Sequence, residues 1–140
     1  MGLLLRSVRL PISATAAGMT PLAEVPAART LEEARLVRTH VPNPFLPGVV
    51  PFVAPTEAAA WAVEREANEA RAPWWPGVAL RHRLVIGTAD QVAEELACWY
   101  AAGAVDGYHL IPPPTPHGLA PFAESVPPLL AHLARWSRAG

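Results

Sequence analysis

The fold of this chain is decided by two neighbouring stretches, Val85-Ile86-Gly87-Thr88-Ala89-Asp90-Gln91-Val92 and Gly103-Ala104-Val105-Asp106-Gly107-Tyr108-His109-Leu110-Ile111-Pro112-Pro113-Pro114. In order, they predict a strand, a capped helix, a second strand over Tyr108–Ile111 and a proline-rich loop. The short apolar run Leu84–Ile86 is typical of a strand buried on both faces of a parallel sheet. Strands and helices that alternate in this way predict an α/β protein, in which the loops after the strands build the active site.

The helix between these two strands has signals at both ends. Thr88 and Gln91 have the spacing of a capping box, in which each side chain accepts a hydrogen bond from a free backbone N–H. Gly103 is expected to end this helix, because glycine readily adopts the left-handed conformation of a helix C-cap. A last helix should begin near Pro121, and Pro127-Pro128 should kink or split it.

A third strand and helix precede these elements. Pro47-Gly48 opens a strand over Val49–Val53, and Thr56 is the expected N-cap of a helix that runs to about Ala70. Residues Ala72–Arg83, which include Trp74-Trp75-Pro76-Gly77, are expected to form a linker. The two tryptophans fit either an exposed apolar patch or ordinary packing under a loop.

The chain divides at about residue 44. Prolines interrupt residues 1–44, so this part is expected to be irregular, with one short helix over Leu31–Arg38. Thr30 and Glu33 have the spacing of a capping box at the start of that helix. Residues 45–140 then hold about three strand–helix units, too few to close a barrel.

Composition limits the possible partners. The chain has 140 residues, enough for one domain, and 11 Arg and no Lys against 12 acidic residues. This balance does not favour nucleic acid or an anionic membrane as a partner, and no apolar run reaches the length of a membrane span. Cys98 is the single cysteine, which excludes an internal disulfide and fits a reducing, cytoplasmic setting; within its helix it is expected to pack rather than react.

Few residues are candidates for chemistry. Gly87 and Thr88 lie where a strand meets a helix, so free N–H groups there could hold a phosphate, although a helix cap alone also explains them. His109 could line a substrate pocket or be a structural histidine, and Pro112 and His117 belong to a rigid loop on the expected active-site face. The histidines are scattered along the sequence, so no metal site and no catalytic residue is predicted.

Several ordered segments resemble the luciferase-like flavin-dependent monooxygenases, in the branch of nitrilotriacetate and dibenzothiophene-sulfone monooxygenases. The matching segments are Leu46–Val53, Thr56–Ala58, Gly87–Ala93, Ala102–Pro113 and Gly118–Phe122. In that branch the third segment reads Gly-Thr-Pro-Glu-Gln-Val-Ala, and Asn stands where this chain has His109. The resemblance implies the last units of a TIM barrel, an enzyme that uses reduced FMN and O2 on a small organic substrate, and a separate flavin reductase.

Members of that family are far longer, and the strands that hold most of their flavin have no counterpart here. We therefore expect a C-terminal fragment of a partial TIM barrel that is inactive by itself, with Gly87 and Thr88 as its remaining flavin contacts. Two alternatives stay open. The chain is either a non-catalytic barrel fragment that pairs with itself as a homo-oligomer or with a complementing chain, or the product of a gene remnant.

Overall fold

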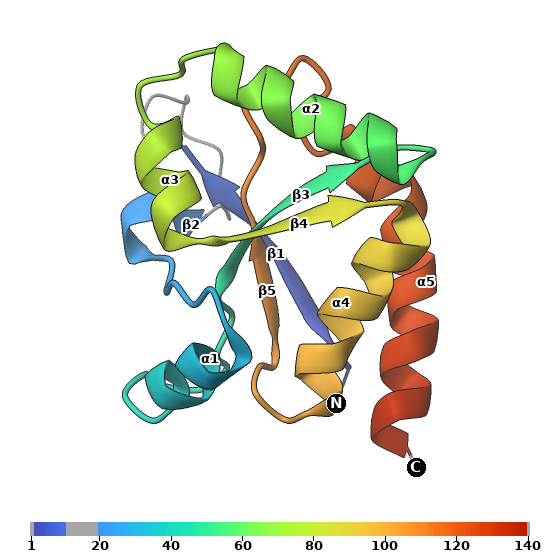
Figure 1. The fold of residues 1–140 in the computed structure, drawn as a ribbon. Coiled ribbons are helices and arrows are strands. Elements are labelled where there is room, and N and C mark those ends of the chain that lie inside the picture. The colour runs from blue at the N-terminus through green and yellow to red at the C-terminus, as the bar shows by residue number, and fades with distance from the viewer. Residues whose placement is uncertain (1, 11–19, 140) are drawn as a thin grey trace.

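A five-stranded parallel sheet forms the centre of the molecule (Figure 1). The computed structural model describes residues 2–10 and 20–139, with the side chains of the last helix described to residue 133. The strands are β1 (Leu4–Arg9), β2 (Thr20–Pro21), β3 (Gly48–Val53), β4 (Arg83–Gly87) and β5 (Gly107–Leu110). They lie in the order β2-β1-β5-β3-β4.

Helices connect the strands and cover both faces of this sheet. They are the 3-10 helix η1 (Leu22–Glu24) and the α-helices α1 (Leu31–Arg38), α2 (Glu57–Glu69), α3 (Trp75–Arg81), α4 (Ala89–Ala101) and α5 (Ala120–Ala139). The predicted α/β class is therefore confirmed, and so is the short helix α1. The oxygen of Thr30 accepts a hydrogen bond from the N–H of Glu33 at the start of α1.

Two sequence-based expectations are wrong, and the expectation that Pro127-Pro128 would kink or split the last helix is wrong as regards the split. Leu4–Arg9 is a strand rather than irregular chain, and it pairs with β5 along the register Leu4 to Gly107. The expected linker contains α3, because the proline at the second position of this helix begins it rather than ending it. Pro127 and Pro128 lie inside α5 and do not split it.

Asp106 and Gly107 join the N-terminal strand to the rest of the sheet. The Asp106 carboxylate accepts hydrogen bonds from Arg38 with both oxygens at 2.9 Å, and one of these oxygens also accepts from the N–H of Phe45. Gly107 lies so close to β1 that a Cβ atom there would collide with the carbonyl oxygen of Leu4. This Asp-Gly pair therefore has a structural role in this chain.

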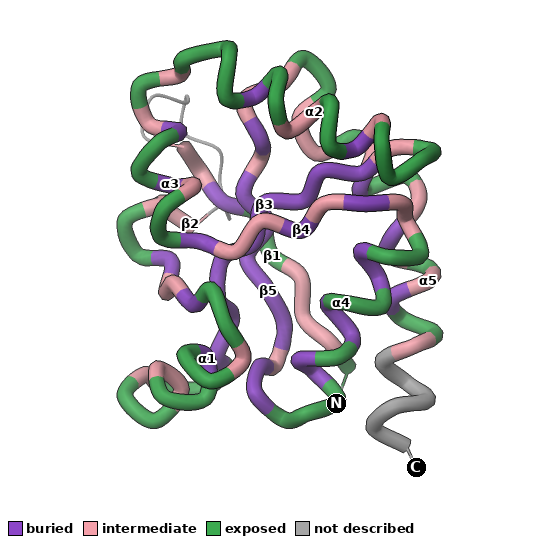
Figure 2. Tube along the Cα trace, in the orientation of Figure 1, coloured by how far each residue is buried: buried purple, intermediate pink, exposed green. Residues whose placement is uncertain are grey.

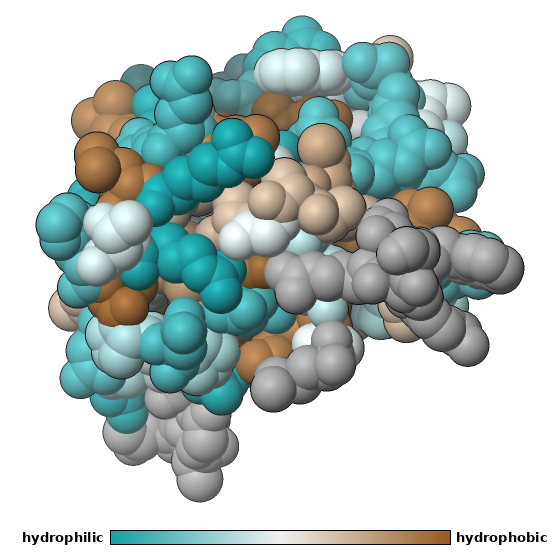
Figure 3. Space-filling model, turned by 90° about the horizontal axis from the view of Figure 1, so that it is seen from below, coloured by the Kyte–Doolittle hydropathy of each residue, from teal (hydrophilic) through white to brown (hydrophobic). Residues whose placement is uncertain are grey.

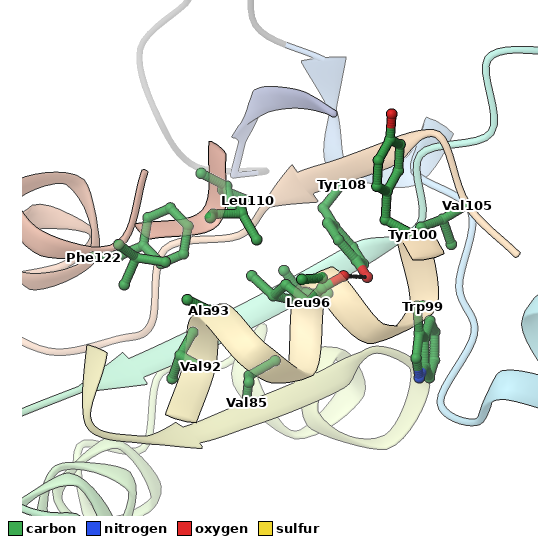
Figure 4. Close-up of a cluster of buried hydrophobic side chains, with 14 of the residues drawn as sticks. Val85, Val92, Ala93, Leu96, Trp99, Tyr100, Val105, Tyr108, Leu110 and Phe122 are labelled. Atoms are coloured by element: carbon green, nitrogen blue, oxygen red, sulfur yellow. Dashed lines mark hydrogen bonds between the residues drawn. The ribbon is translucent and has the colours of Figure 1, made fainter. Parts of the chain in front are cut away.

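Helices α4 and α5 cover one face of the sheet with an apolar core. Alternate strand residues point into it, among them Val85, Tyr108 and Leu110, and they meet Leu96 and Phe122 of the two helices (Figure 4). The hydroxyl of Tyr108 donates a 2.6 Å hydrogen bond to the carbonyl of Leu96, so this buried polar group is satisfied. Helix α1 packs against the same cluster through residues that include Ala34.

Helices α2 and α3 cover the opposite face. Here Val50 and Phe52 of β3 meet Ala67 of α2 and Trp75 of α3, and the ring centroids of Phe52 and Trp75 are 5.8 Å apart. The sheet therefore lies between two helix layers, and Figure 2 shows that its central strands β3 and β5 are buried along their whole length.

The described surface is mixed in polarity. Leu36, Trp61 and Leu80 are the large apolar side chains exposed among the described residues. Figure 3 shows the side seen from below, where apolar residues are dispersed among polar ones. None of the described helices is both long enough and apolar enough to cross a membrane.

Candidate functional site

A cavity of about 640 Å³ lies at the carboxyl ends of the strands, where β3 and β5 separate. The β3–β5 register covers only Gly48 and Val49, and the N–H of Ile111 then bonds the carbonyl of Val49. In contrast, β3 stays paired with β4 up to Val53. Because β4 and β5 lie on opposite sides of β3, this is a topological switch point, the place where open α/β sheets bind ligands.

The floor of the cavity is apolar. Phe52 and Val53 come from the end of β3, and the loop after β5 contributes Pro113; all three are buried. Prolines also line it at positions 51, 55, 116 and 121. Since proline fixes its own φ angle, these walls are stiff, and they can hold a small apolar group away from water.

The rim of the cavity is acidic. Glu66 of α2, Asp90 of α4 and Glu124 of α5 all line it and are all exposed, and none of the described lining residues is an arginine. The rim also carries the exposed side chain of His117. Three carboxylates from three different helices therefore converge around one apolar floor.

Thr88 lies in the cavity wall, but its polar groups are already used. Its N–H donates to the side-chain oxygen of Gln91 at 2.9 Å, and its hydroxyl accepts from the N–H of Gln91 at 3.3 Å, so the predicted capping box is confirmed. A Cβ atom on Gly87 would lie 2.5 Å from that Gln91 oxygen, which explains the glycine there. The structure thus gives both residues a structural task, and their role in cofactor binding stays a prediction.

His109 lies outside the cavity lining, on the face covered by α2 and α3. It is 6% exposed, its Nδ1 has no hydrogen-bond partner among the described residues, and burial together with the nearby Arg6 charge lowers its pKa. His82, at the end of α3, is 1% exposed and also has an unpartnered Nδ1. Burial, with a smaller contribution from Arg81, lowers the pKa of His82 to about 4.

The remaining residues that the sequence singled out include one that lines the cavity and others that do not. Pro112 belongs to the same loop as Pro113 but is not among the lining residues, whereas His117 is. In the described part of the chain, no three His, Cys, Asp or Glu side chains gather closely enough to hold a metal ion. Cys98 is exposed on α4, so the expectation that it packs internally is wrong.

Sequence reasoning missed the acidic rim. Glu66, Asp90 and Glu124 lie far apart in the sequence, and each alone is an ordinary carboxylate on the exposed side of a helix. Asp90 lies in the first turn of α4, where acidic residues are common for reasons of helix stability. A usable signal was that Asp90 and Glu124 come soon after the starts of helices at the expected carboxyl edge of the sheet, where functional residues of α/β proteins gather, whereas Glu66 lies near the end of α2 and gave no such signal.

Comparison with known proteins gives two matches to monooxygenases. No family model matches the chain. The N-acetyl-S-(2-succino)cysteine monooxygenase of Bacillus subtilis (strain 168) is 35% identical over 49 residues, which are 35% of this chain and 11% of that protein. The solved structure of EDTA monooxygenase from Chelativorans sp. BNC1 has a TM-score of 0.52 and 23% sequence identity, and the match covers 74% of this chain and 38% of that one.

These matches confirm the relationship to monooxygenases that the sequence motifs indicated. The structural match also supports the α/β fold, although β5 pairs here with β3 rather than with β4, whereas consecutive strands of a barrel are neighbours. In both cases the chain spans well under half of the protein that it resembles.

Proposed function

We propose that this chain corresponds to the C-terminal part of a luciferase-like, flavin-dependent monooxygenase, and that the cavity is its share of the active site. One observation supports this proposal above all. The segments that carry the sequence resemblance also build the cavity, since Thr88–Asp90, Pro113, Gly118 and Pro121 all line it. These segments meet at the carboxyl edge of the sheet, which is where β/α barrel enzymes bind their substrates.

The cavity does not fit FMN as a whole. Its apolar floor suits a flat ring, but a phosphate group needs cationic side chains or free N–H groups. Of the described lining residues none is arginine, three are acidic, and the Thr88 N–H is already bonded to Gln91. We therefore assign no step of flavin or oxygen chemistry to this chain, and any bound FMN must have its phosphate outside this cavity.

The residues present can position a small organic substrate and exclude water from it. Phe52 and Val53 supply apolar contact, and the prolines fix the shape of the wall without acid–base chemistry of their own. His117 adds to the lining an imidazole that can donate or accept a hydrogen bond. In the complete enzyme O2 would be the oxidant, and reduced flavin from a separate reductase would supply the electrons that activate it.

A titration with two flavins tests the proposal. FMN and riboflavin, each oxidised and reduced, are added to the purified chain, and flavin fluorescence and the melting temperature are followed. We expect riboflavin to bind at least as tightly as FMN and to raise the melting temperature, because the ring fits and the phosphate does not. Binding of neither flavin by the folded chain would contradict a flavin role for this chain by itself.

A second candidate is a non-catalytic module that pairs with itself or with a complementing chain. The observation that favours it is the end position of β4 in an open sheet, since a terminal strand offers a template for further pairing. Each face of the sheet already packs against helices in a buried cluster, so neither face requires further strands to cover it. Light scattering after size-exclusion chromatography decides the matter, because a stable oligomer without flavin supports the module and a monomer contradicts it.

A further inference from the structure

We propose that the cavity at the carboxyl edge selects a small organic cation with an apolar body, such as an arylalkyl ammonium compound. This inference rests on the proposed function only for the location of the site, and it concerns the charge of the ligand. Both related monooxygenases carry the names of substrates that contain carboxylates. The cavity of this chain has the opposite preference, for three reasons.

The first reason is the division between floor and rim. The buried floor around Phe52 and Pro113 is apolar and takes an uncharged body, while the exposed rim carries Glu66, Asp90 and Glu124. A ligand with its apolar part on the floor places its polar end at the rim. Asp and Glu side chains are ionised at neutral pH, so a cationic end is attracted there and an anionic end is repelled.

The second reason is that several donors for an anion are already used. At the start of α4 the N–H groups of Thr88 and Gln91 bond each other's side chains. At the start of α5 Pro121 has no N–H, and the N–H groups of Ala120 and Ala123 bond the carbonyls of His117 and Leu119. The capacity of these two helix N-termini to hold an anion is therefore reduced.

The third reason is the sum of charges. Each of the two helix N-termini at the cavity contributes about half a positive charge, against three full negative charges at the rim. No arginine is among the described lining residues to compensate. The field at the mouth of the cavity is therefore negative.

Three phenyl compounds of matched size test this proposal: 2-phenylethylammonium, 2-phenylethanol and phenylacetate. Binding is followed by NMR chemical-shift changes and by tryptophan fluorescence, since the Trp75 ring lies against Phe52 at the cavity floor. We expect the cation to bind roughly tenfold more tightly than the neutral alcohol, and the anion to bind most weakly. Added salt should reduce the preference for the cation, because the rim is exposed to solvent.

Charge-neutral variants locate the effect. The triple variant E66Q/D90N/E124Q should bind the alcohol as before and lose the preference for the cation. The control variant E24Q/E32Q/E69Q removes three exposed carboxylates that do not line the cavity, and it should keep the preference. Equal binding of anion and cation, or equal losses in the two triple variants, would overturn the proposal, and neither result alters the flavin titration.

Discussion

The two faces of the sheet are built differently. The face under α4 and α5 has a larger buried cluster, and its central polar group, the Tyr108 hydroxyl, is hydrogen-bonded. The face under α2 and α3 has a smaller cluster and two buried histidines whose Nδ1 atoms have no partner among the described residues, and the cavity lies at the carboxyl edge between α2 and the starts of α4 and α5. The first face therefore carries most of the stability of the fold, and the second combines modest packing with groups that can respond to pH.

Truncation of one phenylalanine on each face should give the largest effect. Phe122→Ala is expected to lower the free energy of unfolding by about 3–5 kcal/mol, because Phe122 is 2% exposed and lies within the larger cluster. Phe52→Ala should cost less, about 3 kcal/mol, because the ring lies in the smaller cluster and borders an existing cavity. Urea unfolding followed by circular dichroism measures both. An equal or larger loss for Phe52→Ala would contradict the unequal division of stability.

Acidification should weaken the α2–α3 face. The pKa of His82 is about 4 in the folded chain and near 6.5 when unfolded, so between these values the unfolded chain binds more protons. Stability is therefore highest above about pH 6.5 and should fall by about 3 kcal/mol as the pH drops to about 4. The lowered pKa of His109 adds to this loss in the same direction.

Urea midpoints at several pH values measure this dependence. His82→Gln should remove most of the slope between pH 6.5 and 4, whereas the control His40→Gln, at an exposed position after α1, should leave it unchanged. A slope that survives in His82→Gln would show that other groups cause the acid sensitivity.

Two glycine substitutions should change stability in opposite directions. Gly48→Ala places a Cβ atom 2.6 Å from Nδ1 of His82 and 2.8 Å from Ile111, so we expect a loss of about 1–3 kcal/mol from overpacking. Gly77→Ala in α3 meets nothing within 4 Å and should stabilise the chain by about 0.5–1 kcal/mol. Thermal unfolding of the two variants side by side measures both. A neutral Gly48→Ala would mean that the histidine side of the sheet is loosely packed.

Loss of a helix cap on each face should have the smallest effect. Thr88→Ala removes one half of the capping box of α4 and should cost about 1 kcal/mol. Thr56→Ala removes the single cap of α2, in which the Thr56 oxygen accepts from the N–H of Ala59, and should cost somewhat less. The midpoints of urea unfolding give the two values. A larger cost for Thr56→Ala would place more stability on the α2–α3 face than the packing suggests.

Some of the candidate site could be predicted, and some could not. The loop with Pro113 and His117, and the helix start at Thr88, were expected at the carboxyl edge and do line the cavity. His109 was considered for the same pocket, but its strand position directs it to the buried face near Arg6. The alternation along a strand tells which side chains share a face of the sheet. Which of the two faces a given side chain lies on becomes known only when the covering helices are placed.

The sequence by itself determined the elements that depend on near neighbours. The helix starts at Thr30, Thr56 and Thr88 follow from hydrogen bonds to a residue three positions later, which the chain makes without any distant partner. Short apolar strands between such helices then led to the α/β class. These contacts are local, so the order of residues is enough to predict them.

Only the tertiary structure decided what depends on distant contacts. β1 exists because it pairs with β5 across a separation of about a hundred residues, at Gly107, and α3 is held by the burial of Trp75 against Phe52. The acidic rim likewise arises because three helices bring Glu66, Asp90 and Glu124 to one cavity. Burial and electrostatic fields are sums over neighbours in space, and those neighbours are fixed only when the sheet and its two helix layers have assembled.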